Sequence, residues 1–175
     1  QRGTDKDRWA QEDSLATQWD QRAAMAAEFI PAGVRVLDVG AGAMALGSFL
    51  KPGSTYQPAD VVERRPGCFV VDLNRREWPP GEYDWVSFLG VLEYIHDIDW
   101  PLARARETAP RLLVTYCTDI GADPQLRRGL GWVNDLPAEA FAARLAANGW
   151  RVDETREVKR GPSNIQLMYV CSRAG

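Results

Sequence analysis

The sequence has 175 residues, of which 45% are hydrophobic and 26% are charged, and its formal net charge is −3. These proportions predict a soluble globular domain that is long enough to bury a core. The slightly acidic balance, with no block of lysine or arginine, argues against a nucleic-acid partner, and the longest apolar stretch is too short for a membrane span. Because residue 1 is glutamine rather than methionine, we expect a trimmed or partial form of a longer polypeptide.

The three cysteines, Cys68, Cys117 and Cys171, lie far apart in the sequence. Their spacing fits neither a zinc site nor a disulfide framework, and two of them lie in apolar runs. We therefore expect reduced and mostly buried thiols in a cytoplasmic protein that holds no metal.

The chain alternates between helix-like and strand-like patterns. Residues 1–14 are polar and are predicted to fray, so that a single domain spans residues 15–175. Apolar residues at helical spacing predict a helix over 15–30. Strands are predicted at 34–39, 55–60, 68–73, 83–90, 111–117, 150–158 and 164–171. Further helices are predicted at 44–50, over about ten residues after Asp99, and at 137–149. This order indicates an α/β fold with a mostly parallel sheet and an antiparallel edge.

Two connections in this pattern are short. VVERRPG (61–67) joins the second and third strands, and a connection of similar length joins the third and fourth. A helical crossover needs about a dozen residues or more, so few helices are expected around strands two to four. The edge of the third strand is therefore predicted to pair with a second copy of the chain or to be covered by a neighbouring domain.

A glycine-rich turn follows the first predicted strand. The segment from Gly40 to Ala45 fits G-x-G-x-x-G/A, and Asp60 lies twenty residues after Gly40, a pattern that alone would suggest NAD. Asp38 argues against this ligand, because its carboxylate would lie close to a pyrophosphate. Two like charges about 4 Å apart repel by about 4 kcal/mol at an effective dielectric constant near 20. The P-loop pattern is absent from the sequence.

Acidic residues lie at the ends of three successive predicted strands: Asp38, Asp60 and Asp72. S-adenosylmethionine carries an amine and a sulfonium that suit Asp38, ribose hydroxyls that suit Asp60, and an adenine that suits an acceptor at Asp72. The three acids therefore favour a cationic nucleoside over an anionic dinucleotide.

The sequence resembles the class I S-adenosylmethionine-dependent methyltransferases, in particular the small-molecule branch called type 11. The resemblance spans about residues 15–173, in the family's order. It is carried by VLDVGAGAMALG, YQPAD, VVDLN, YDWVSFLGVLEYIHD, AEAFAARLAANGWRVDE and QLMYVCSR. It implies a Rossmann-like seven-stranded sheet of order 3-2-1-4-5-7-6 in which the last strand is antiparallel. Met44, where many relatives have a small residue, departs from the pattern.

The resemblance also implies cofactor contacts. It assigns Asp38, Gly40 and Gly42 to the methionine end of S-adenosylmethionine and Asp60 to the ribose. It further assigns the adenine side and the sulfonium region to four residues: Asp72, Leu73, Leu89 and Gly90.

Candidates for catalysis and acceptor binding lie after the fourth and fifth strands. Glu93 is either a substrate-side acid or a local hydrogen-bond anchor, and His96, the only histidine, is either a general base or a solvent-exposed residue. Tyr116, near the fifth strand, is a third candidate for catalysis. The candidates for acceptor binding, near the fifth strand and in the loop after it, are Tyr116, Asp119, Trp132 and Asn134. Trp132 alternatively fixes its loop to the core.

The sequence therefore predicts methyl transfer to an oxygen or nitrogen nucleophile of a small or saccharide-like acceptor. A non-catalytic S-adenosylmethionine-binding or interaction module of a larger protein is the alternative, and an NAD-dependent oxidoreductase is a third.

Overall fold

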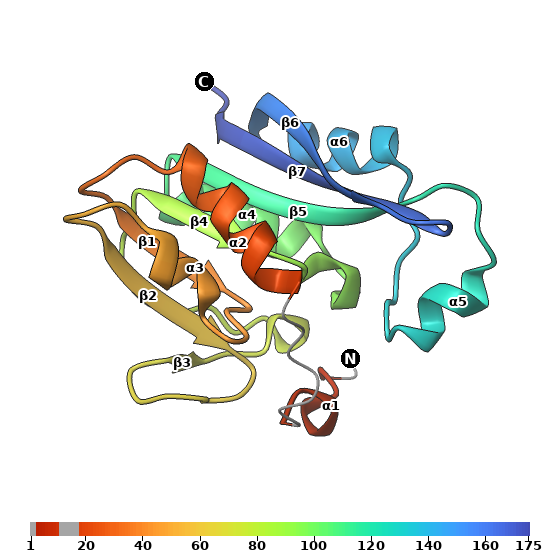
Figure 1. The fold of residues 1–175 in the computed structure, drawn as a ribbon, viewed down its shortest axis with the longest axis horizontal. Coiled ribbons are helices and arrows are strands. Elements are labelled where there is room, and N and C mark those ends of the chain that lie inside the picture. Colours follow the sequence, from red (N-terminus) through yellow and green to blue (C-terminus); the bar gives the residue numbers. More distant parts are fainter. Residues whose placement is uncertain (1–2, 11–17) are drawn as a thin grey trace.

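The computed structural model of the chain describes residues 3–10 and 18–175 (Figure 1). Its centre is one sheet of seven strands in the order β3-β2-β1-β4-β5-β7-β6. The strands are β1 (Arg35–Val39), β2 (Thr55–Asp60), β3 (Phe69–Val70), β4 (Trp85–Phe88), β5 (Arg111–Asp119), β6 (Trp150–Arg160) and β7 (Asn164–Arg173). The first five are parallel, and β7 runs antiparallel to β5 and β6, which confirms the predicted fold.

Helices cover both faces of the sheet. They are α1 (Lys6–Ala10), α2 (Gln18–Phe29), α3 (Ala45–Phe49), α4 (Asp99–Thr108), α5 (Pro124–Gly129) and α6 (Ala138–Ala147), with short 3-10 helices η2 (Leu73–Arg75) and η3 (Leu92–Tyr94). Helices α2 and α3 pack on one face through Ala26 and Leu46, whereas α4 and α6 contribute Leu102 and Phe141 to the core of the other face (Figure 1).

The central strand β4 shows why the sheet is buried on both sides. All four of its residues are buried, and Val86 and Phe88 belong to one core while Trp85 belongs to the other. Such uninterrupted burial is typical of parallel strands with helices on both faces. None of the helices in the described part of the chain exceeds 12 residues, and none is long and apolar enough to cross a membrane.

The sheet is thinly covered near β3, as the short connections predict. Strand β3 has only two residues, and η2 is the helical element between β3 and β4 in the described residues. The side chain of Val70 is half-exposed at this edge. A partner at this edge stays a prediction. The three cysteines are free and buried, as predicted.

Residues 3–10 differ from the expected frayed segment. Trp9 packs edge-to-face on Tyr94 with a ring-centroid distance of 4.8 Å, and Arg8 Nη2 donates to the carbonyl of Leu130 at 2.7 Å. These contacts reach across the fold, so the polar composition of the segment gives no sign of them. Residues 11–14, the rest of the segment that is expected to fray, lie outside the described residues.

Candidate functional site

A cavity of about 780 Å³ lies at the carboxyl ends of β1, β2 and β4. Its lining includes Thr4 and Trp9 from the N-terminal segment, residues of the turn after β1, and residues near the β6–β7 turn such as Lys159. Open α/β sheets bind ligands at this edge, where the strand order reverses on either side of β1. The cavity is within the size range of small-molecule sites.

The turn after β1 requires glycine at its first position. Gly40 has a φ of 77°, and a Cβ added to it would lie 2.3 Å from Cγ2 of Val91. The amides of Gly40 and Ala41 both donate to the carbonyl of Ala59, at 2.7 and 3.1 Å. Gly42 also has a positive φ, of 52°. The turn therefore brings its backbone close to the cavity and fixes it to the end of β2.

Asp38 lies at the cavity with its carboxylate held by two hydroxyl groups. The side chain is buried, and its oxygens accept hydrogen bonds from Tyr56 Oη at 2.5 Å and Ser87 Oγ at 2.7 Å. Burial raises the pKa of Asp38, and the two hydroxyl donors oppose this shift. The neighbouring strands β2 and β4 thus orient the acid that precedes the glycine turn.

Asp60 lies at the end of β2 and contacts the same turn. Its Oδ2 accepts the amide hydrogen of Gly42 at 2.7 Å, and its Oδ1 accepts that of Val61 at 2.7 Å. Asp60 lines the cavity together with Gly40 and Gly42. Asp38, Asp60 and the two glycines are therefore brought together at one cavity, and their roles in cofactor binding stay predictions.

Asp72 has a different environment from the other two acids. It is fully buried and caps η2 by accepting the amide hydrogen of Asn74 at 3.0 Å. Its oxygens also accept the amide hydrogen of Thr4 at 2.9 Å and the Thr4 hydroxyl hydrogen at 2.6 Å. The following residue, Leu73, lines the cavity. The carboxylate of Asp72 is thus occupied by the N-terminal segment.

Leu89 and Gly90 line the cavity at the end of β4. Gly90 has a φ of 68°, and a Cβ added to it would lie 2.4 Å from Nη1 of Arg22. Arg22, on α2, also lines the cavity and interacts electrostatically with Glu93 and Asp38. No local pattern in the sequence indicates a role for this arginine, because a charged residue on an amphipathic helix usually faces solvent.

Glu93 is buried in η3 and lines the cavity. Its Oε1 accepts the amide hydrogen of Cys117 at 2.8 Å, whereas its Oε2 is buried without a hydrogen-bond partner among the described residues. Burial raises the pKa of Glu93. Among the three candidates for catalysis, Glu93 is the one at the cavity.

The other two candidates for catalysis, His96 and Tyr116, do not line this cavity. His96 is exposed and its backbone amide donates to Asn74 Oδ1. The Tyr116 hydroxyl donates to Asn134 Oδ1, and its ring stacks on Phe141 at 4.3 Å. These contacts make Tyr116 part of the core.

Of the residues predicted to contact the acceptor, Trp132 lines the cavity. Asn134 instead fixes the loop to η3, because its Nδ2 donates to the carbonyls of Leu92 at 2.8 Å and Ile95 at 2.9 Å. Asp119 accepts the amide hydrogen of Gly121 in a tight turn.

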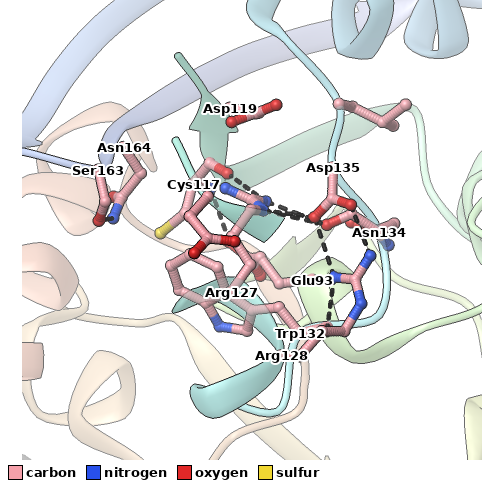
Figure 2. A network of polar contacts seen from close by, with 12 residues as sticks. Glu93, Cys117, Asp119, Arg127, Arg128, Trp132, Asn134, Asp135, Ser163 and Asn164 are labelled. Atoms are coloured by element: carbon pink, nitrogen blue, oxygen red, sulfur yellow. Dashed lines mark hydrogen bonds and ion pairs between the residues drawn. The ribbon is translucent and has the colours of Figure 1, made fainter. Parts of the chain in front are cut away.

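Arg127, which sequence reasoning missed, organises the loop before α6 (Figure 2). Its side chain is 1% exposed and lies over the ring of Trp132 at 4.7 Å. It donates to Asp135 Oδ1 at 2.7 Å and to the carbonyl of Cys117 at 3.0 Å. The Arg128 hydrogen bond, with a contribution from Arg127, lowers the pKa of Asp135. Two adjacent arginines on a short helix look like solvated surface charges, so no local signal could have revealed the buried one.

No protein-family model matches the sequence, and no curated protein matches it. Solved structures do share the fold. A Burkholderia thailandensis 1,6-didemethyltoxoflavin-N1-methyltransferase with bound S-adenosylhomocysteine has 19% identity and a TM-score of 0.70, over 97% of this chain and 82% of that one. The Synechocystis magnesium protoporphyrin IX methyltransferase with bound S-adenosylhomocysteine has 17% identity and a TM-score of 0.70, over 97% and 94%. A chain from a Haloferax volcanii complex that contains the Trm112 methyltransferase activator has 12% identity and a TM-score of 0.76, over 100% of both chains.

These similarities show that the chain has the Rossmann-like fold of the class I S-adenosylmethionine-dependent methyltransferases.

Proposed function

We propose that the protein transfers a methyl group from S-adenosylmethionine to a nitrogen or oxygen of a small-molecule acceptor. The observation that carries this proposal is the joint placement of Asp38, Gly40, Gly42 and Asp60 at one cavity. S-adenosylmethionine would supply an activated methyl group on a sulfonium. Two carboxylates favour such a cation, and the same two carboxylates would repel a diphosphate.

The described residues fit this cofactor in most respects. Asp38 would face the amine and sulfonium end, and Asp60 would accept hydrogen bonds from the ribose, while Val61, Val71 and Leu73 give the cavity an apolar wall for the adenine. Structures with the same fold have been solved with S-adenosylhomocysteine or S-adenosylmethionine bound, which supports this choice. Asp72 would serve the adenine only after release from Thr4.

The protein's contribution to the reaction would be mainly alignment. Holding an acceptor and a methyl donor in one closed cavity can contribute about 7–11 kcal/mol to lowering the barrier when the geometry is favourable. A rigid glycine turn on one side and the Trp132 loop on the other would give the cavity two fixed walls.

Calorimetry tests the proposal. Titration with S-adenosylmethionine and S-adenosylhomocysteine should show one site, whereas NADH should give no heat of binding and no rise in melting temperature. Release of S-adenosylhomocysteine in the presence of small amines, phenols and saccharides then tests turnover. Binding of NADH in place of the sulfonium nucleoside would overturn the proposal.

A second candidate is a non-catalytic S-adenosylmethionine-binding or interaction module. The similarity to a chain from a complex that contains a methyltransferase activator supports this second candidate, because that chain comes from an assembly of two proteins. Tight cofactor binding without turnover on any acceptor would support this module.

We also propose a cytoplasmic location and association through the β3 edge, where Val70 is half-exposed. Light scattering should show a dimer that Val70→Lys converts to a monomer, because a charge at an edge strand opposes pairing. A monomer at all concentrations would contradict association between copies.

A further inference from the structure

Three carboxyl groups of the described residues line the cavity, and they differ in how their oxygens are used. Both oxygens of Asp38 accept from side-chain hydroxyls, and both oxygens of Asp60 accept from backbone amides. Glu93 uses only Oε1, and its Oε2 is buried without a partner among the described residues. A buried acceptor of this kind usually has a ligand or water as its partner. Among the described residues, Glu93 Oε2 is therefore the carboxyl oxygen of the cavity that has no hydrogen-bond partner.

The surroundings of Glu93 are rigid. Its carbonyl accepts the amide hydrogen of Val133 at 2.8 Å, which fixes the loop that carries Trp132 beside it (Figure 2). Arg127 covers part of the Trp132 ring, and Trp132, which lines the cavity, is 9% exposed. These contacts fix the Glu93 backbone to the Trp132 loop, and the Cys117 amide holds Oε1 of the carboxyl group.

Aromatic side chains line the cavity near this carboxyl group. Trp132 precedes Val133, whose amide bonds to the carbonyl of Glu93. Tyr94 is adjacent in sequence to Glu93, and Trp9 packs edge-to-face on Tyr94. Aromatic walls with one buried acceptor fit a flat ring that carries a hydrogen-bond donor.

The carboxyl group and the glycine turn belong to one site. The guanidinium group of Arg22 packs beside Gly90 and interacts electrostatically with both Glu93 and Asp38. A ligand that reaches Glu93 would therefore share the cavity with whatever binds at Asp38.

We propose that Glu93 is a catalytic residue that selects a planar aromatic acceptor with an N–H or phenolic O–H group. Its Oε2 accepts the hydrogen bond from that group. This inference rests on the proposed function. As the acceptor atom forms its bond to the methyl carbon, the carbon–sulfur bond breaks and its electron pair stays on sulfur. The acceptor's proton moves to Glu93 Oε2, so that a sulfonium and a carboxylate become a thioether and a carboxylic acid.

The environment of Glu93 suits this role. Desolvation raises the pKa of the carboxyl group, and the backbone amides of Glu93 and Cys117, the charge of Arg22 and the Cys117 thiol oppose the shift. A carboxylate with a raised pKa is a stronger base than an exposed one.

The experiment compares two neutral probes, indole and 1-methylindole, which differ in the N–H donor. Their affinities are measured by calorimetry on the free protein and on protein saturated with S-adenosylhomocysteine. We expect the wild type to bind indole roughly tenfold more tightly, since a hydrogen bond to a charged group has about this effect. The preference should weaken as the pH falls and Glu93 becomes protonated.

Glu93→Gln tests the assignment, because glutamine keeps an acceptor for Cys117 and presents an amide donor toward the indole N–H. Its indole preference should vanish at every pH, while its affinity for S-adenosylhomocysteine stays within about twofold of the wild type. Glu139→Gln, on the exposed face of α6, is the matched control and should behave as the wild type.

An equal affinity of the wild type for the two probes would overturn the proposal, as would no binding of either probe at about 5 mM. The wild-type comparison stands even where Glu93→Gln fails to fold. Failure of the proposed function is a separate result, since the free protein can prefer indole without binding S-adenosylhomocysteine. With an acceptor in hand, Glu93→Gln should lower kcat about 100-fold or more and remove the acidic limb of the pH–rate profile.

Discussion

The hydroxyl group of Thr4 donates a 2.6 Å hydrogen bond to Asp72, 68 residues away, while the Thr4 amide donates to the other oxygen of the same carboxylate. The N-terminal segment thereby closes the side of the cavity near Leu73. The same acid is the one that the sequence assigns to the adenine. Thr4 and a bound cofactor are therefore expected to compete for Asp72.

Thr4→Val tests this competition. Valine keeps the shape and the backbone amide but removes the hydroxyl, so residues 3–10 should exchange their amide hydrogens faster. The affinity for S-adenosylhomocysteine should increase about fivefold, because the site is released more often. Hydrogen exchange and calorimetry measure the two effects, with Thr155→Val on the exposed side of β6 as the control. Weaker binding by Thr4→Val would show instead that the segment supports the cofactor.

Asp60→Asn should weaken cofactor binding with a smaller effect on folding. The substitution removes the charge, and its amide group cannot accept from both Gly42 and Val61 as the carboxylate does. A lost hydrogen bond to a charged group corresponds to about 1.5–3 kcal/mol, or about 10–100-fold in the affinity for S-adenosylhomocysteine. Asp153→Asn on β6 is the control. An affinity within twofold of the wild type would rule out a role for Asp60 at the ribose.

The fold and the glycine turn could be predicted because their signals are local. Strand VRVLDV, the positive-φ positions at Gly40 and Gly42 and the acids at strand ends follow from burial and backbone geometry over a few residues. The roles of Asn134, Arg127 and Thr4 could not be predicted in this way. Each depends on a contact with a distant backbone or side chain, and their residue types are equally common in solvated loops.

Tyr56→Phe should change the pH dependence of cofactor binding. Burial raises the pKa of Asp38, and the Tyr56 hydroxyl is the largest influence that opposes this. A cationic ligand requires the ionised carboxylate, so the affinity for S-adenosylmethionine is lost as the pH falls through the raised pKa. Without the hydroxyl this loss should begin at higher pH. Affinities measured across the acidic range provide the test.

Tyr83→Phe is the control for this experiment, because the Tyr83 hydroxyl donates to the carbonyl of Pro80, away from the cavity. Its pH profile should coincide with that of the wild type. Coincident profiles for Tyr56→Phe and the wild type would show that Asp38 does not interact with the cationic end of the ligand.

Asp135→Asn should destabilise the Trp132 loop at neutral pH. The carboxylate pairs with buried Arg127 at 2.7 Å and with Arg128 at 2.5 Å, and Arg127 keeps carbonyl partners after the substitution. The expected loss in the free energy of unfolding is therefore about 1–3 kcal/mol rather than the larger cost of an isolated buried charge. Urea unfolding between neutral and acidic pH measures it.

The pH dependence of this loss has a defined sign. The hydrogen bond from Arg128 and the contribution of Arg127 lower the pKa of Asp135 in the folded state, so its stabilising effect is present above the ordinary carboxyl pKa of about 3.9. That effect disappears as the pH falls through the lowered pKa, and the wild type and Asp135→Asn should then converge. Asp119→Asn, which keeps an acceptor for Gly121, should match the wild type throughout. A difference between the wild type and Asp135→Asn that persists unchanged in acid would mean that packing of the side chain, rather than its charge, holds the loop.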